Sequence, residues 1–306
     1  MPAMLTHDRF AAARAFIAGH ARPLDAALYR HRFEGGEAGA ILAALVPFQN
    51  PDGGFGHGLE PDIATPASTA IATSVGLRTL RRAGVDAGHP MVAGAARWLE
   101  SHVADGVWPI IGPEVDQAPH APWWGWSNEL ADSWNGFRWN PTAEILADLY
   151  RFRAAVPALF LDAVEARMRR SIREADVIEG AYDLRCATIL AETPEAPADL
   201  REALANLLVR SVRQHDPDDE HAPVLDLAPT PQSLLAPVLE GRIDHAAEVL
   251  IDGQQDDGGW SPFWDWAFVD EAAWARAKAD WRGGLTRLAL ESLAGHGRIE
   301  GLAAAA

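Results

Sequence analysis

The sequence contains a single cysteine, Cys186. One cysteine excludes a disulfide bond within the chain and a metal site built from several thiolates. The sequence also lacks any run of about 18 apolar residues, the length that a membrane span requires. Its opening, MPAMLTHDRF, lacks the basic segment and apolar core of a signal peptide. We therefore expect a cytoplasmic protein with no membrane span.

Basic residues are scarce. Lysines and arginines number 26 against 43 aspartates and glutamates, which gives a formal net charge of −17. Nucleic acids and other polyanions would be repelled, so we expect no nucleic-acid partner. The acidity is typical of a soluble surface, and attraction of cations is the alternative interpretation.

No linker divides the 306 residues, and 48% of them are hydrophobic, which is enough for a sizeable core. We predict one domain over residues 1–306 rather than two smaller ones. Strand-like alternation is almost absent. Apolar residues instead recur at helical spacing, as in 38–46, 92–99, 200–208 and 243–251.

An internal repeat organises these helices. Segment 41–55 reads ILAALVPFQNPDGGF and segment 249–260 reads VLIDGQQDDGGW. The matched positions are Gln49 with Gln254, Asp52 with Asp257, Gly53 with Gly258, Gly54 with Gly259, and Phe55 with Trp260. Two weaker copies are WLESHVADGVW and LVRSVRQHDPDD. The repeated unit is therefore a helix, a glycine or proline turn, and a second helix.

This pattern predicts an all-α fold of about eleven or twelve helices, enough for six pairs. Because each pair leaves an apolar face exposed, we expect the pairs to close into an (α/α)6 toroid, with an open solenoid as the alternative. The long, aromatic-rich loops near 103–139 and 254–281 favour the toroid, since a regular array has units of constant length.

The QNPDGGF and QQDDGGW segments resemble the repeat of the prenyltransferase and squalene oxidase superfamily, which includes terpenoid cyclases and protein prenyltransferase β subunits. The run QNPDGGFGHGLEPDIATP, with APWW and NPTAE, resembles a bacterial branch of that superfamily. The resemblance covers most of the chain. It implies a toroid whose cavity binds isoprenoids, with structural roles for Gln49, Phe55, Gln254 and Trp260. A fold alone does not specify the reaction.

The run Asp216–Asp219 resembles the acidic DxDD signature with which class II terpene cyclases protonate an alkene. Asp218 and Asp219 are therefore candidate acids, because clustered carboxylates keep one group protonated. Proline occupies the variable position, and the stretch HDPDDEHAP also fits a solvated turn. Class II cyclases react between two helical domains, and this chain is long enough for one. In a homodimer, the second chain would supply the missing helical domain that closes the site.

The loop GFGHGLEPD places His57, Glu60 and Asp62 close together after the first repeat. A histidine with two carboxylates suits acid–base chemistry, so these three residues are our leading catalytic candidates. The alternative is structural: Asp62 caps a helix that begins near Pro66, and Glu60 is solvated.

Tryptophans gather in the two long loops. Their π faces suit an apolar or cationic ligand, sugar stacking, or core filling. We predict substrate binding by Trp123, Trp124, Trp126, Trp134, Trp139, Trp260, Trp264 and Trp266.

We expect no metal or other cofactor. The spacing of Asp183 and Cys186 differs from the Asp-x-Cys pattern of zinc-dependent prenyltransferases, and Cys186 lies in an apolar helix, which predicts a buried structural thiol. A Walker phosphate loop, a GxSxG elbow and an HExxH helix are all absent from the sequence.

The leading hypothesis is an isoprenoid-cyclase-like enzyme that binds a small apolar molecule. One alternative is a glycan-active toroid hydrolase or lyase, and another is a noncatalytic ligand-binding repeat protein. A cavity walled by aromatic and aliphatic side chains with one or two carboxylates favours the first hypothesis. Exposed tryptophans in an open groove favour the second, and a plugged cavity favours the third.

Overall fold

The computed structural model describes residues 2–126, 136–214 and 224–302. These residues form twelve α-helices and four short 3-10 helices, with isolated bridges but no β-strand among them. The predicted all-α class is thereby confirmed, whereas the closed toroid stays a prediction. In the described ranges, no helix combines the length and apolar character that a membrane crossing needs.

The chain divides into two compact units. Unit 1 comprises Met1–Ala44 and Asp216–Ala306, and unit 2 comprises Leu45–His215. The single domain over residues 1–306 stays a prediction.

Unit 1 brings together the two ends of the sequence. Its helices are α1 (His7–His20), α2 (Pro23–Phe33), α3 (Ala38–Leu45, which ends at the boundary), α11 (Val224–Leu227), α12 (Ala236–Asp252) and α13 (Glu271–Gly295). Helices α1 and α2 both pack on α13. The backbone N–H of Leu5 donates to the Arg298 carbonyl at 2.8 Å, and Glu300 N–H donates to the Leu5 carbonyl at 3.0 Å.

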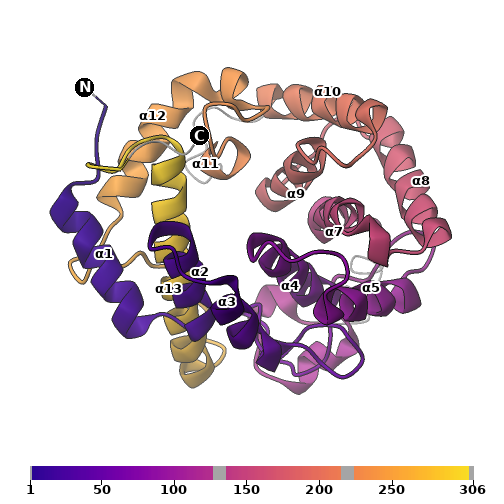
Figure 1. Ribbon diagram of the computed structural model, residues 1–306, viewed down its shortest axis with the longest axis horizontal. Coiled ribbons are helices and arrows are strands. Elements are labelled where there is room, and N and C mark those ends of the chain that lie inside the picture. The colour runs from indigo at the N-terminus through magenta and orange to yellow at the C-terminus, as the bar shows by residue number, and fades with distance from the viewer. Residues whose placement is uncertain (1, 127–135, 215–223, 303–306) are drawn as a thin grey trace. The chain divides into compact units, whose positions relative to one another are not determined.

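Unit 2 is built from helical hairpins in two layers. Its α-helices are α4 (Ala70–Arg82), α5 (Pro90–His102), α7 (Trp139–Arg151), α8 (Ala158–Glu174), α9 (Ala181–Ala191) and α10 (Ala198–Gln214). The 3-10 helices are η1 (Val46–Phe48), η2 (Pro113–Gln117), η3 (Pro122–Trp124) and η4 (Arg153–Ala155). Helix α7 packs between α4 and α9, and α5, α8 and α10 pack against these three as a second layer (Figure 1). Residues 141–150 of α7 are all buried, so α7 forms the centre of this unit.

Local chemistry sets where α4 begins. The Thr69 side chain accepts a hydrogen bond from Ala72 N–H at 3.1 Å and caps the helix, which starts at Ala70. The interpretation of Asp62 as the cap of a helix near Pro66 is therefore wrong. Asp62 lies eight positions before the first helical residue and is 3% exposed.

The two strong copies of the repeat fold into the same turn, one in each unit. Gln49 Nε2 donates to the carbonyls of Gly53 and Met91, both at 2.9 Å. Gln254 Nε2 donates to the carbonyls of Gly258 and Arg9, also at 2.9 Å. Each glutamine thus ties its turn to a neighbouring helix, which confirms the predicted structural role of both.

The aromatic position of the repeat is structural as well. The N–H of Phe55 donates to Thr73 Oγ1 at 3.1 Å, and the N–H of Trp260 donates to Thr286 Oγ1 at 3.0 Å. Both rings are buried, at 0% and 5% exposure. These matched bonds anchor each turn to the helix that follows it.

Candidate functional site

A hollow of about 710 Å³ opens in unit 2 beside the first repeat turn. Four stretches surround it: the turn itself, the segment that leads into α4, the end of α5, and the segment before and at the start of η2. Its lining residues are Asn50, Pro51, Asp52, Pro66, Ala67, Ser68, Thr69, Ala70, Trp98, His102, Trp108, Pro109, Ile111, Gly112 and Glu114.

Two indole rings form part of its wall. Trp108 is 2% exposed, and its Nε1 donates to the Leu99 carbonyl at 2.8 Å. Trp98 is 5% exposed and stacks on His102 with ring centroids 4.3 Å apart. Because both rings are packed on other parts of the protein, they are fixed wall elements rather than exposed platforms.

The turn of the repeat fixes Asp52. Its Oδ1 accepts hydrogen bonds from Gly54 N–H at 2.9 Å and from Ser68 Oγ at 2.8 Å. Asn50 Nδ2 donates to Ser68 Oγ at 2.9 Å and joins the same network. The two bonds that Asp52 accepts from the described residues both fall on Oδ1, so Oδ2 retains capacity to bind a ligand.

His102 and Glu114 add two further groups that can exchange protons. His102 Nδ1 lies 2.8 Å from the Trp98 carbonyl, which can only accept. The neutral imidazole therefore carries its hydrogen on Nδ1, and Nε2 is left as a base. Glu114 belongs to η2, and its backbone carbonyl accepts from Thr65 Oγ1 at 3.2 Å. The hollow thus combines an imidazole, the Asp52 and Glu114 carboxyl groups, and aromatic walls.

The predicted catalytic loop lies next to this hollow but does not line it. His57 has a left-handed φ of 58°, and its Nε2 lies 2.8 Å from Oδ1 of Asn50. Asp62 is buried and Glu60 is partly buried. The contact between His57 and Asn50 therefore connects this loop to the lining of the hollow. Asp218 and Asp219 lie outside the described residues.

The seven predicted tryptophans that the structure describes do not line the hollow. In unit 2, Trp123 is 43% exposed, Trp124 and Trp126 pack against a small apolar cluster around Ile111, and Trp139 begins α7. Trp134 lies outside the described residues.

In unit 1, Trp260 and Trp266 are 5% and 1% exposed. Trp264 contacts the ring of Trp281 edge-on, with centroids 5.1 Å apart. Trp98 and Trp108 line the hollow instead. They stand at the two ends of the weak repeat copy WLESHVADGVW, which is the sequence feature that points to them.

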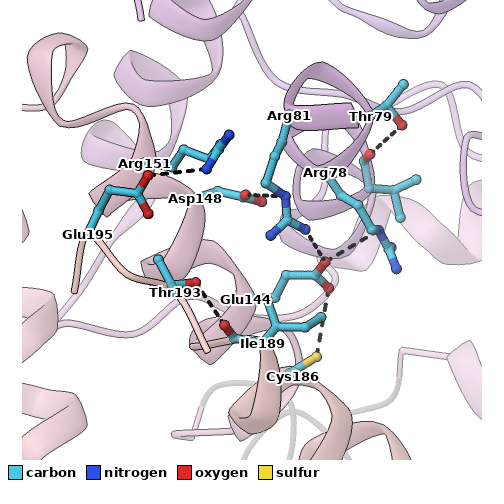
Figure 2. Close-up of polar contacts among 11 residues, drawn as sticks. Arg78, Thr79, Arg81, Glu144, Asp148, Arg151, Cys186, Ile189, Thr193 and Glu195 are labelled. Atoms are coloured by element: carbon cyan, nitrogen blue, oxygen red, sulfur yellow. Dashed lines mark hydrogen bonds and ion pairs between the residues drawn. The ribbon is translucent and has the colours of Figure 1, made fainter. Parts of the chain in front are cut away.

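A second group of functional interest is a buried charge cluster between α4, α7 and α9 (Figure 2). Arg78 Nε and Arg81 Nη2 each lie 3.4 Å from Glu144 Oε1. Arg81 Nε lies 3.2 Å from Asp148 Oδ1. The two arginines come from α4 and the two carboxylates from α7, so the cluster ties these helices together.

The two carboxyl groups of the cluster differ in protonation. Burial raises the pKa of Glu144, but the positive charges of Arg78, Arg185 and Arg81 outweigh burial, and the pKa falls below its usual range. Burial raises the pKa of Asp148 to about 7, because Arg81 offsets only part of the desolvation and the Glu144 charge repels. Asp148 is thus a carboxyl group that holds its proton close to neutral pH.

Cys186 is 2% exposed, so the predicted buried thiol is confirmed. Its Sγ lies 3.5 Å from Asn140 Oδ1 and 3.9 Å from Glu144 Oε2, and burial raises the pKa of the thiol. Asp183 accepts a hydrogen bond at Oδ1 from the backbone N–H of Asn140 at 2.8 Å. Within the described ranges, no three histidine, cysteine, aspartate or glutamate side chains are grouped to hold a metal ion.

Comparison with protein-family models, curated proteins and solved structures finds no match to this chain.

Proposed function

We propose that the hollow of unit 2 is the substrate site of an acid–base enzyme that acts on a small, largely apolar molecule, with terpenoid or prenyl compounds as the leading substrate class. The observation that carries the proposal is the lining itself, where His102, Asp52 and Glu114 share one hollow with Trp98 and Trp108. Its volume of about 710 Å³ lies within the range of small-molecule sites.

The roles follow from the geometry. His102, with its hydrogen on Nδ1, would accept a proton at Nε2 and return it from the imidazolium form. Glu114 would serve as the partner acid or base. Asp52 would orient the substrate, because its Oδ1 is already held by Gly54 and Ser68.

The proposed substrate class rests on the resemblance of the repeat to that of terpenoid cyclases and prenyltransferases, and on the burial of the indole rings. A glycan site would use exposed tryptophan faces, whereas Trp98 and Trp108 are 5% and 2% exposed. Aromatic walls favour an apolar ligand body. This supports the isoprenoid hypothesis over the glycan hypothesis.

The test is conversion of a substrate panel by the purified full-length chain. Geranylgeranyl diphosphate, squalene and terpenoid alkenes are incubated with the wild type, and products are identified by gas chromatography and mass spectrometry. We expect Glu114→Gln and His102→Gln to reduce turnover at least ~100-fold, the usual contribution of a general acid or base. Glu100→Gln changes an exposed carboxylate of α5 that does not line the hollow, and it should leave turnover unchanged.

Other outcomes contradict the proposal in distinct ways. Saturable binding of the panel without products would support the noncatalytic alternative. Cleavage of oligosaccharides in place of terpenoid conversion would support the glycan alternative. Full turnover in both variants would exclude this hollow as the site of reaction.

A further inference from the structure

Each repeat turn forms a corner, in which an aspartate of the turn accepts a bond from the glycine two residues later, next to an aromatic ring. Asp52 Oδ1 accepts from Gly54 N–H at 2.9 Å, and Asp257 Oδ1 accepts from Gly259 N–H at 3.1 Å. Each of these glycines lies directly against an aromatic ring of another helix: a Cβ on Gly54 would lie 2.8 Å from Trp98 of α5, and a Cβ on Gly259 would lie 2.8 Å from Phe16 of α1. The pair Asp52 and Trp98 therefore corresponds to the pair Asp257 and Phe16.

A histidine follows the aromatic residue in both corners. His102 stacks on Trp98 at 4.3 Å, and His20 lies 5.0 Å from Phe16 by ring centroids. Carboxylate, aromatic ring and imidazole thus recur together, one set in each unit.

In unit 1 this corner is filled by Arg282 of α13. Its Nη2 lies 2.8 Å from Asp257 Oδ1 and 3.0 Å from Gln255 Oε1. Its Cζ lies 4.6 Å from the centroid of the Phe16 ring. A guanidinium group therefore binds the carboxylate and an aromatic face at once, with His20 still in place beside Phe16.

Among the described residues of unit 2, no guanidinium group lies at the matching position, and the much shorter Ser68 side chain donates to Asp52 Oδ1 at 2.8 Å. Thr286 and Thr73 make the same bond to the aromatic residue of the repeat. Arg282 precedes Thr286 by four residues, and Thr69 precedes Thr73 by four. Because Thr69 is short and caps α4, the corner of unit 2 is part of the open hollow.

We propose that the hollow binds the guanidinium group of a ligand through Oδ2 of Asp52, next to His102, in the corner that matches the one Arg282 occupies in unit 1. A guanidinium is planar and weakly hydrated and presents several N–H donors to a carboxylate. Asp52 and Glu114 give the lining two carboxylates, and none of the described residues that form it is a lysine or arginine.

This inference shares the hollow with the proposed function but requires no reaction. Two kinds of ligand carry this group: a free small molecule and a peptide with an arginine side chain. Both sources present the same chemistry to Asp52, so the experiment uses separate ligands for them.

The first test is titration of the full chain with N-methylguanidinium chloride, followed by tryptophan fluorescence and NMR, with methylammonium chloride at matched ionic strength. We expect saturable binding with methylguanidinium preferred at least 10-fold over methylammonium. Asp52→Asn keeps an acceptor for Gly54 and Ser68 but removes the charge, and we expect it to weaken binding at least 10-fold. Asp257→Asn, the matched change in the filled corner, should leave binding to the hollow unchanged.

The second test uses the filled corner as an internal standard. Arg282→Ala vacates the unit 1 corner, and we expect the number of methylguanidinium sites to rise from one to two. Arg282→Thr, which places the residue type of Thr69 at the matching position, is the substitute if the alanine variant does not fold by circular dichroism. Tighter binding of agmatine indicates a free small molecule as the natural source, and tighter binding of N-acetyl-arginine N-methylamide indicates a peptide.

Absence of saturable binding to the wild type, equal affinity for methylammonium, or unchanged affinity in Asp52→Asn would each overturn the inference. These results are independent of turnover. Guanidinium binding without terpenoid conversion would retain the inference and reject the proposed function, and conversion without guanidinium binding would do the reverse.

Discussion

Arg81 Nε lies 3.2 Å from Oδ1 of Asp148, a carboxyl group with 0% exposure in the centre of unit 2. Glu144, one helical turn earlier on α7, shares the arginines of α4 with it. Both carboxyl groups are buried, yet their pKa values move in opposite directions. The pKa values differ because more arginines stabilise the charged form of Glu144, while the charge of Glu144 disfavours the charged form of Asp148.

The pKa of Asp148, about 7 against an ordinary 3.8, makes stability depend on pH. Between these values the folded protein holds a proton that the unfolded chain has released, so the free energy of unfolding falls as pH rises and levels off above about pH 7. At ~1.4 kcal/mol per unit, the total is about 4 kcal/mol. Urea unfolding from pH 4 to pH 8 measures it.

Asp148→Asn isolates this contribution, because asparagine stays neutral. We expect the wild type to lose about 4 kcal/mol relative to the variant between pH 4 and pH 8. Asp162→Asn, at an exposed position of α8, is the control and should follow the wild type. Parallel curves for wild type and Asp148→Asn would contradict the assignment.

Glu144→Gln should have the opposite effect at pH 8. Glu144 compensates Arg78 and Arg81, and its lowered pKa means that the folded state favours its charge. Removing that charge leaves two partly buried arginines without the carboxylate they share, which costs about 3 kcal/mol. Urea unfolding at pH 8 should therefore rank the proteins as Asp148→Asn at or above the wild type, and Glu144→Gln well below it. Equal losses in the two variants would refute the distinction.

The repeat turn could be predicted from the sequence because its bonds are local. Gln49, Asp52 and Gly53 lie within five residues, and their spacing alone determines a turn closed by Asp52 and Gln49. The all-α class followed from helical spacing for the same reason. The start of α4 depends on one cap, Thr69, so the sequence pattern alone predicts a start near Pro66, which is too early.

The hollow could not be predicted, because it depends on segments far apart in the sequence. Asn50, Trp98 and Glu114 meet only after α4 and α5 pack. Nearness in sequence suggested that His57 and Asp62 act together, but Asp62 is buried and His57 bonds to Asn50. Tryptophan density was an equally weak guide, because Trp260 and Trp266 fill the core of unit 1.

Gly53→Ala tests the turn that shapes the hollow. Gly53 has φ +96°, and a Cβ there would lie 2.3 Å from the Gly94 carbonyl oxygen, in backbone that cannot move away freely. We expect a loss of about 2–4 kcal/mol in the free energy of unfolding. Gly19→Ala is the matched control, because no atom lies within 4 Å of its added Cβ and it sits in α1. It should raise stability by about 0.5–1 kcal/mol.

Cys186 provides a probe of the packing between α7 and α9. The thiol is 2% exposed, and burial together with the Glu144 charge raises its pKa well above the usual range. Only the thiolate attacks a disulfide reagent, so the native protein should react with Ellman's reagent at pH 8 roughly 100-fold more slowly than the urea-unfolded chain. Ser101→Cys places a second thiol at an exposed position of α5 and should react rapidly in the native state. Rapid reaction of Cys186 in the folded wild type would mean that α7 and α9 separate readily, and the charge cluster of Glu144 and Asp148 would then be open to solvent.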